Sequence, residues 1–133
     1  MQDFEKLPIR AQNDIVIIRQ KVRFWATKIG LSIIEQTKVI TAASELARNT
    51  LDYGGGGNVE ISTLTNPLNR PGIQLVFADE GPGIPDLKLA LTDGYTTGGG
   101  LGMGLSGSKR LMNEFNIESE VGKGTRVTVI KWK

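Results

Sequence analysis

The sequence contains no cysteine and no histidine. The lack of cysteine excludes disulfide bonds and thiolate metal sites, and the lack of histidine excludes a phosphohistidine, a histidine-based catalytic triad and most zinc sites. No apolar run approaches the roughly 20 residues that a membrane-spanning helix needs. The first residues, Met1 to Glu5, lack the basic and apolar regions of a signal peptide. We therefore expect a cytoplasmic protein that does not bind membranes.

An excess of charge of one sign is also missing. The chain has 16 basic and 14 acidic residues, a net charge of +2, and the basic residues are scattered. This balance argues against a nucleic-acid partner. With 133 residues, of which 39% are hydrophobic, the chain is expected to form one domain, residues 1–133, around one core.

Apolar residues recur at helical spacing in two segments of the first half of the chain. Asn13 or Asp14 is expected to cap the first helix, which ends at Gly30. Ser32 begins a second helix that runs to about Tyr53, where four consecutive glycines follow.

The remaining segments predict mostly strands. A short strand is expected around Ile9, and two hairpins are expected, formed by 59–63 with 73–78 and by 117–120 with 125–132. A third helix, from about Met103 to Phe115, separates the hairpins. At the start of the second helix, Glu35 lies three residues after Ser32 and is expected to complete a capping box with it. The predicted fold class is α/β (α+β), a two-layer sandwich with a mixed, mainly antiparallel sheet and helices on one face.

The first candidate motif is Glu45 with Asn49, four residues apart on the second helix. Side chains at this spacing lie on one helix face, about 6 Å apart. Asn49 offers a neutral oxygen to Mg²⁺, which binds oxygen ligands. Glu45 offers a carboxylate that accepts a proton from a hydroxyl or a water. The alternative is an ordinary solvated polar face with an Arg48–Asp52 pair.

The second motif begins at Asp79, directly after an apolar strand, and continues through Gly81, Gly83 and Ile84. A carboxylate at a strand end can accept a hydrogen bond from an exocyclic amino group such as that of adenine. The glycines allow the backbone to approach a flat ring closely. The alternative is a simple turn between two elements.

The third motif is a glycine-rich segment directly before the third helix. Bare backbone N–H groups at a helix N-terminus bind anions, and glycines let phosphates reach them. No Gly-Lys-Ser/Thr sequence follows, so it is not a Walker A loop, and Lys109 is assigned to the surface. The alternative is a flexible linker. The candidate nucleotide-binding residues in this segment are Gly98, Gly99, Gly100, Leu101, Gly102, Met103 and Gly104.

Taken in order, these motifs resemble those of the GHKL ATPase superfamily, which has the Bergerat fold. Glu45 and Asn49 match its N box. Its two glycine boxes are matched by Asp79, Gly81 and Gly83 and by Gly100, Gly102 and Gly104. Gly124 and Thr125 match a Gly-Thr step that in the family supports the adenine-contacting aspartate. The resemblance implies ATP and Mg²⁺ as cofactors and a lid over ATP between Leu87 and Leu101.

Within the superfamily, the sequence is most similar to the small serine/threonine-protein kinases of the RsbT type. The resemblance is carried by 44–49, 93–102 and 130–132. It implies phosphorylation of STAS-domain antagonist proteins in bacterial stress signalling, and regulated binding to a PP2C-type phosphatase. Phe24 or Trp25 of the first helix is a candidate docking group, and the alternative is burial in the core. Two alternatives stay open, an anti-sigma factor that sequesters a sigma subunit and a nucleotide-sensing adaptor with little turnover.

Overall fold

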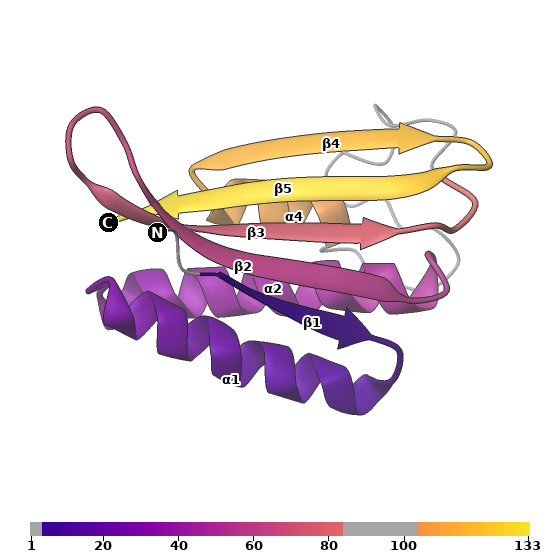
Figure 1. Ribbon diagram of the computed structural model, residues 1–133, viewed down its shortest axis with the longest axis horizontal. Coiled ribbons are helices and arrows are strands. Elements are labelled where there is room, and N and C mark those ends of the chain that lie inside the picture. The colour runs from indigo at the N-terminus through magenta and orange to yellow at the C-terminus, as the bar shows by residue number, and fades with distance from the viewer. Residues whose placement is uncertain (1–3, 84–103) are drawn as a thin grey trace.

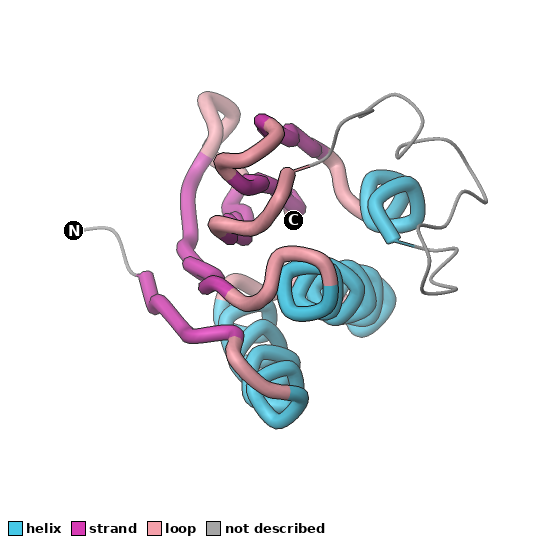
Figure 2. Tube along the Cα trace, turned by 90° about the vertical axis from the view of Figure 1, so that its right-hand side faces the viewer, coloured by secondary structure: helices cyan, strands magenta, loops and turns pink. Residues whose placement is uncertain are grey.

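The computed structural model describes residues 4–83 and 104–133. In chain order, these residues form β1 (Phe4–Ile9), α1 (Gln12–Lys28), α2 (Ile33–Asp52), β2 (Gly57–Thr65), β3 (Pro71–Asp79), α4 (Gly104–Leu111), β4 (Glu114–Glu120) and β5 (Gly124–Trp132). The strands make one sheet in the order β1-β2-β3-β5-β4. The helices lie on one face of this sheet (Figures 1 and 2).

This architecture confirms the expected two-layer α+β fold. One detail of the expectation was wrong, because the sheet is antiparallel at every pairing among the described strands rather than mixed. No helix in the described ranges has the length and hydropathy of a membrane span.

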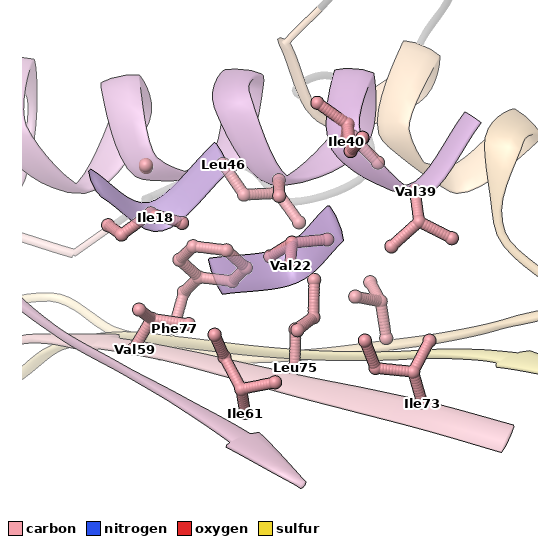
Figure 3. Packing of buried hydrophobic residues seen from close by; sticks show 14 of the residues in the cluster. Ile18, Val22, Val39, Ile40, Leu46, Val59, Ile61, Ile73, Leu75 and Phe77 are labelled. Carbon is pink, nitrogen blue, oxygen red and sulfur yellow. The ribbon is translucent and has the colours of Figure 1, made fainter. Parts of the chain in front are cut away.

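The core fills the space between the sheet and the two long helices (Figure 3). Successive side chains of a strand point to opposite faces, so Ile73, Leu75 and Phe77 of β3 all face the helices, and each is almost fully buried. Burying each such side chain contributes about 1.5–3 kcal/mol. The same alternation places Asp79, the last residue of β3, on the helix side of the sheet.

The start of α1 differs from the prediction, whereas the start of α2 matches it. Helix α1 begins at Gln12, and Asp14 lies inside its first turn, where its carboxylate accepts hydrogen bonds from the backbone N–H groups of Arg10 and Ala11. Neither Asn13 nor Asp14 is therefore the N-cap residue. At α2 the Ser32 hydroxyl caps the N–H of Glu35, as predicted.

The capping box at α2 was only half right, because the Glu35 carboxylate binds the ammonium group of Lys131 instead of returning to the cap. The third helix was predicted too long. Helix α4 ends at Leu111, and Phe115 lies in β4. Phe115 is opposite Val129 of β5, so strand pairing takes it out of the helix. The predicted start at Met103 lies outside the described residues.

Candidate nucleotide site

The carboxylate of Asp79 is fixed by two main-chain donors. Its Oδ1 accepts a hydrogen bond from the N–H of Gly81, at 2.9 Å, and another from the N–H of Thr125, at 3.2 Å. Both donors belong to the protein and both use the same oxygen. Among the described residues, Oδ2 receives no hydrogen bond. A fixed carboxylate with one oxygen left over can accept from a ligand's amino group.

Close backbone packing surrounds this carboxylate. A Cβ atom at Gly124 would lie 2.2 Å from the carbonyl oxygen of Asp79, and Gly124 has a φ of +101°, so both contact and conformation favour glycine there. Gly83, with a φ of +78°, approaches the Glu120 carbonyl in the same way. The turn after β3 therefore packs directly on the β4–β5 turn and on the start of β5, which carries Thr125.

Thr125 supports Asp79 through its main chain. Its N–H supports Asp79, whereas its hydroxyl lies 2.8 Å from the hydroxyl of Ser119. The supporting role implied by the resemblance is therefore performed by the main chain.

Glu45 and Asn49 lie on the second half of α2. The carboxylate oxygen Oε2 of Glu45 is buried, and it is the one buried side-chain oxygen or nitrogen in the described ranges that has no hydrogen-bond partner. Asn49 is half-buried, and its main-chain carbonyl accepts from the N–H groups of Tyr53 and Gly54. The Arg48–Asp52 pair of the alternative interpretation is not among the ion pairs of the described residues.

The motifs meet at one end of the molecule. The last turns of α2, the end of β3 and the β4–β5 turn all lie at the right of Figure 1. The register pairs Gly57, the first residue of β2, with Asp79. Helix α4 packs against α2, and its first residue, Gly104, is the last residue of the second glycine box.

Not every predicted residue can be placed. Gly81 and Gly83 lie in the turn after Asp79, and Lys109 is exposed, as expected. The candidates outside the described residues are Ile84, Gly98, Gly99, Gly100, Leu101, Gly102 and Met103, together with the expected lid from Leu87 to Leu101. Of the two proposed docking groups, Phe24 is 58% exposed, whereas Trp25 is buried and donates its indole N–H to Glu5.

Sequence reasoning missed Gly54. It lies against the Asp79 side chain, so a Cβ there would be 2.4 Å from Cγ of Asp79. The signal was present in the sequence, since Gly54 opens a run of four glycines directly after the helix that carries Asn49. The run was interpreted only as a helix stop.

A hollow of about 470 Å³ opens beside this end of the sheet. Its lining includes Asp79 and Thr125 but neither Glu45 nor Asn49. Its other charged lining residues are three carboxylates, those of Glu80, Glu118 and Glu120, and two cations, Lys123 and Arg126. Because this hollow lacks Glu45 and Asn49, the candidate nucleotide site is assigned to the helix side of the sheet, which α2 covers.

Comparison with known proteins decides the family. Residues 34–133 match the family model described as histidine kinase-, DNA gyrase B-, and HSP90-like ATPase. The chain belongs to this ATPase family. The matched range includes the N box, both glycine boxes and the Gly-Thr step.

Within the family, the chain is 42% identical to the serine/threonine-protein kinase RsbT of Bacillus subtilis (strain 168), over 99% of this chain and 98% of that protein. It is 30% identical to the anti-sigma F factor of Thermoanaerobacter sp. (strain X514), over 92% of this chain and 87% of that protein. The first similarity confirms the expected class of this ATPase-family chain, a serine/threonine-protein kinase of the RsbT type.

Solved structures confirm the fold. The RsbU and RsbW domains of Rv1364c from Mycobacterium tuberculosis match with a TM-score of 0.64 at 18% identity, covering 98% of this chain and 32% of that one. The SiaB-SiaC complex from Pseudomonas aeruginosa matches with a TM-score of 0.54 at 14% identity, covering 98% of this chain and 89% of that one. The fold thus extends to proteins with little sequence similarity.

Proposed function

We propose that this kinase transfers the γ-phosphate of ATP to a serine or threonine hydroxyl of a STAS-domain protein, within a partner-switching pathway. The observation that carries the proposal is the buried, unpartnered oxygen of Glu45. Leaving such an oxygen without a partner costs on the order of 1–3 kcal/mol. A carboxylate kept at that cost on the N-box helix is a candidate for chemistry rather than for stability.

In this proposal Glu45 is the proton acceptor for the incoming hydroxyl. The hydroxyl oxygen forms a bond to the γ-phosphorus, the bond from phosphorus to the ADP oxygen breaks, and the hydroxyl proton passes to Glu45. General-base assistance of this kind contributes about 10²–10⁴-fold to rate. Asp79 Oδ2 accepts from the adenine amino group, while its Oδ1 stays bound to the chain itself.

The phosphate end of the site is assigned to Asn49 and the N-terminus of α4. Among the described residues there is no cluster of three or more acidic side chains that would hold a metal. Mg²⁺ is commonly bound by one or two protein oxygens together with phosphate oxygens and waters. One Asn49 oxygen fits this pattern, and the helix N-terminus adds N–H donors and a favourable dipole.

The alternative is an anti-sigma factor that sequesters a sigma subunit. The similarity to anti-sigma F factors favours it, at 30% identity in the Thermoanaerobacter protein, but RsbT is similar at 42% over nearly the full length of both chains. A nucleotide-sensing adaptor with little turnover is a further alternative. Regulated binding to a PP2C-type phosphatase and a cytoplasmic location remain proposals that rest on the RsbT resemblance.

The test is phosphotransfer with labelled ATP, Mg²⁺ and STAS proteins encoded near this gene, with the label mapped by mass spectrometry. We expect label on serine or threonine of a STAS protein, and loss of most transfer in Glu45→Gln with ATP affinity kept within a few-fold. No transfer to any STAS protein, together with tight binding to a sigma factor, would establish the anti-sigma alternative. ATP binding without transfer or sigma binding would favour the adaptor.

A further inference from the structure

We propose that Gly54 is a positioning residue for ATP recognition, because its missing side chain leaves the space beside the free carboxylate oxygen of Asp79. This inference rests on the proposed role of Asp79 in binding adenine. It assigns a specific duty to one residue of the glycine run between α2 and β2.

The three atoms nearest to a Cβ at Gly54 would all belong to the Asp79 side chain. A Cβ built on Gly54 would lie 2.4 Å from Cγ, 2.5 Å from Oδ2 and 2.6 Å from Cβ of Asp79. Non-bonded carbon atoms normally lie about 3.5–4.0 Å apart. Any side chain at this position would therefore displace the Asp79 carboxylate, and it would do so from the side of Oδ2.

Two hydrogen bonds hold the Asp79 carboxylate in its position beside Gly54. Its Oδ1 is bound by the N–H groups of Gly81 and Thr125, so a rotation away from Gly54 breaks one or both hydrogen bonds. Gly81 is also packed on Gly54, since a Cβ at Gly81 would lie 2.7 Å from the Gly54 Cα and carbonyl oxygen. Gly54 is thus enclosed by the two residues that define the start of the first glycine box.

Backbone strain does not explain this glycine. Gly54 is absent from the residues with positive φ, whereas the next two glycines, Gly55 and Gly56, have φ values of +74° and +105°. A Cβ built on Gly55 would have no atom within 4 Å. A Cβ built on Gly57 would meet the main chain of Ala78 and Asp79. Only Gly54 in this run is close to the carboxyl group of Asp79.

The position of Gly54 also links the two ends of the site. Its N–H donates to the main-chain carbonyl of Asn49, at 3.2 Å. The residue therefore joins the end of the helix that carries the proposed phosphate-side Asn49 to the proposed adenine-side Asp79. A shift of Asp79 away from a new Cβ would alter the spacing between these groups.

The experiment compares Gly54→Ala with Gly72→Ala. Gly72 is a matched control, because its φ is also not positive and a Cβ there would strike a side chain, 2.5 Å from the Trp132 ring, away from Asp79. Calorimetry would measure the affinities of both variants and of the unaltered chain for ATP, ADP and GTP, and thermal unfolding would measure their stabilities.

We expect both variants to lose stability, but only Gly54→Ala to bind ATP and ADP about tenfold or more weakly and to prefer ATP less over GTP. Equal nucleotide affinities in the two variants would overturn the inference. If the unaltered chain bound no ATP, the proposed function would fall together with it. ATP binding without phosphotransfer to a STAS-domain protein would contradict only the proposed function, and the inference about Gly54 would stand.

A double-mutant cycle covers the case in which Gly54→Ala does not fold. Asp79→Gly removes the side chain that the new Cβ would strike, so Gly54→Ala should destabilise the Asp79→Gly background much less than the unaltered chain. An equal destabilisation in both backgrounds would show that the contact is not with the Asp79 side chain, and it would overturn the inference.

Discussion

The ammonium group of Lys131 lies 2.8 Å from the carboxylate of Glu35, which joins the last strand to the first turn of α2. The same ammonium group donates to the main-chain carbonyl of Leu111, at the C-terminus of α4. Lys131 is only 5% exposed. One buried cation therefore holds β5, α2 and α4 together, at the end of α2 opposite to the one that carries Asn49.

This arrangement makes Glu35 a stability residue. Glu35→Ala leaves the Lys131 charge in a buried place with the Leu111 carbonyl as its remaining partner, and we expect a loss of about 1–3 kcal/mol in the free energy of unfolding. The control is Glu120→Ala. Glu120 pairs with Lys123 at 3.6 Å, and the Lys123 side chain is 72% exposed, so we expect the free energy of unfolding to change by no more than about 0.5 kcal/mol. Urea denaturation of both variants measures the difference, and equal losses would contradict it.

Two carboxyl groups make stability depend on pH. The hydrogen bond from Lys131 lowers the pKa of Glu35, and the hydrogen bond from the Trp25 indole lowers the pKa of Glu5, from the ordinary value of 4.5. Because both pKa values are depressed in the folded state, their stabilisation is present above pH 4.5 and is lost as the pH falls through the folded values.

We therefore expect the urea midpoint to fall as the pH is lowered below about 4.5. Trp25→Phe removes the indole donor to Glu5, so this variant should show a smaller decrease over the same range. An unchanged pH dependence in Trp25→Phe would show that the hydrogen bond to Glu5 does not contribute.

Asp79→Asn tests the adenine end of the site without disturbing its support. The amide retains an oxygen for the N–H groups of Gly81 and Thr125, but it places an NH₂ group where Oδ2 was. Two donors then face each other when adenine binds, and an unmet donor costs on the order of 1–3 kcal/mol. We expect ATP affinity to fall about tenfold or more, with little change in melting temperature. Unchanged affinity measured by calorimetry would remove Asp79 from the adenine site.

Glu45→Gln should separate activity from stability. The buried Oε2 of Glu45 has no hydrogen-bond partner among the described residues, so an amide at this position removes no hydrogen bond of that oxygen. We expect a melting temperature that is equal or higher, together with the loss of most phosphotransfer. A marked loss of stability would indicate a structural role for this carboxylate.

The helix and strand order was predictable because each element carries its own apolar period, as in Ile73, Leu75 and Phe77 of β3. The boundaries depended on contacts far away in the sequence. The local sequence pattern places Phe115 on a helix face, but its pairing with Val129 of β5 makes it part of a strand. The local sequence pattern places Glu35 in a capping box, but its carboxylate forms an ion pair with Lys131, 96 positions later.

The candidate site shows the same division. Glu45, Asn49 and Asp79 were recognisable because a reactive side chain is visible in the sequence. Gly54 was not recognised, because its proposed role lies in the absence of atoms beside Asp79, which becomes apparent only when the two segments are packed together.

The support of Asp79 by main-chain N–H groups has a consequence for divergence within the family. Any residue except proline at position 125 can present the N–H that Asp79 accepts, provided that the β4–β5 turn keeps its path. Substitutions can therefore accumulate around the carboxylate while the hydrogen bonds that orient it survive. A deep mutational scan for nucleotide binding should accordingly tolerate many side chains at position 125 and reject proline, in contrast to narrow tolerance at 79.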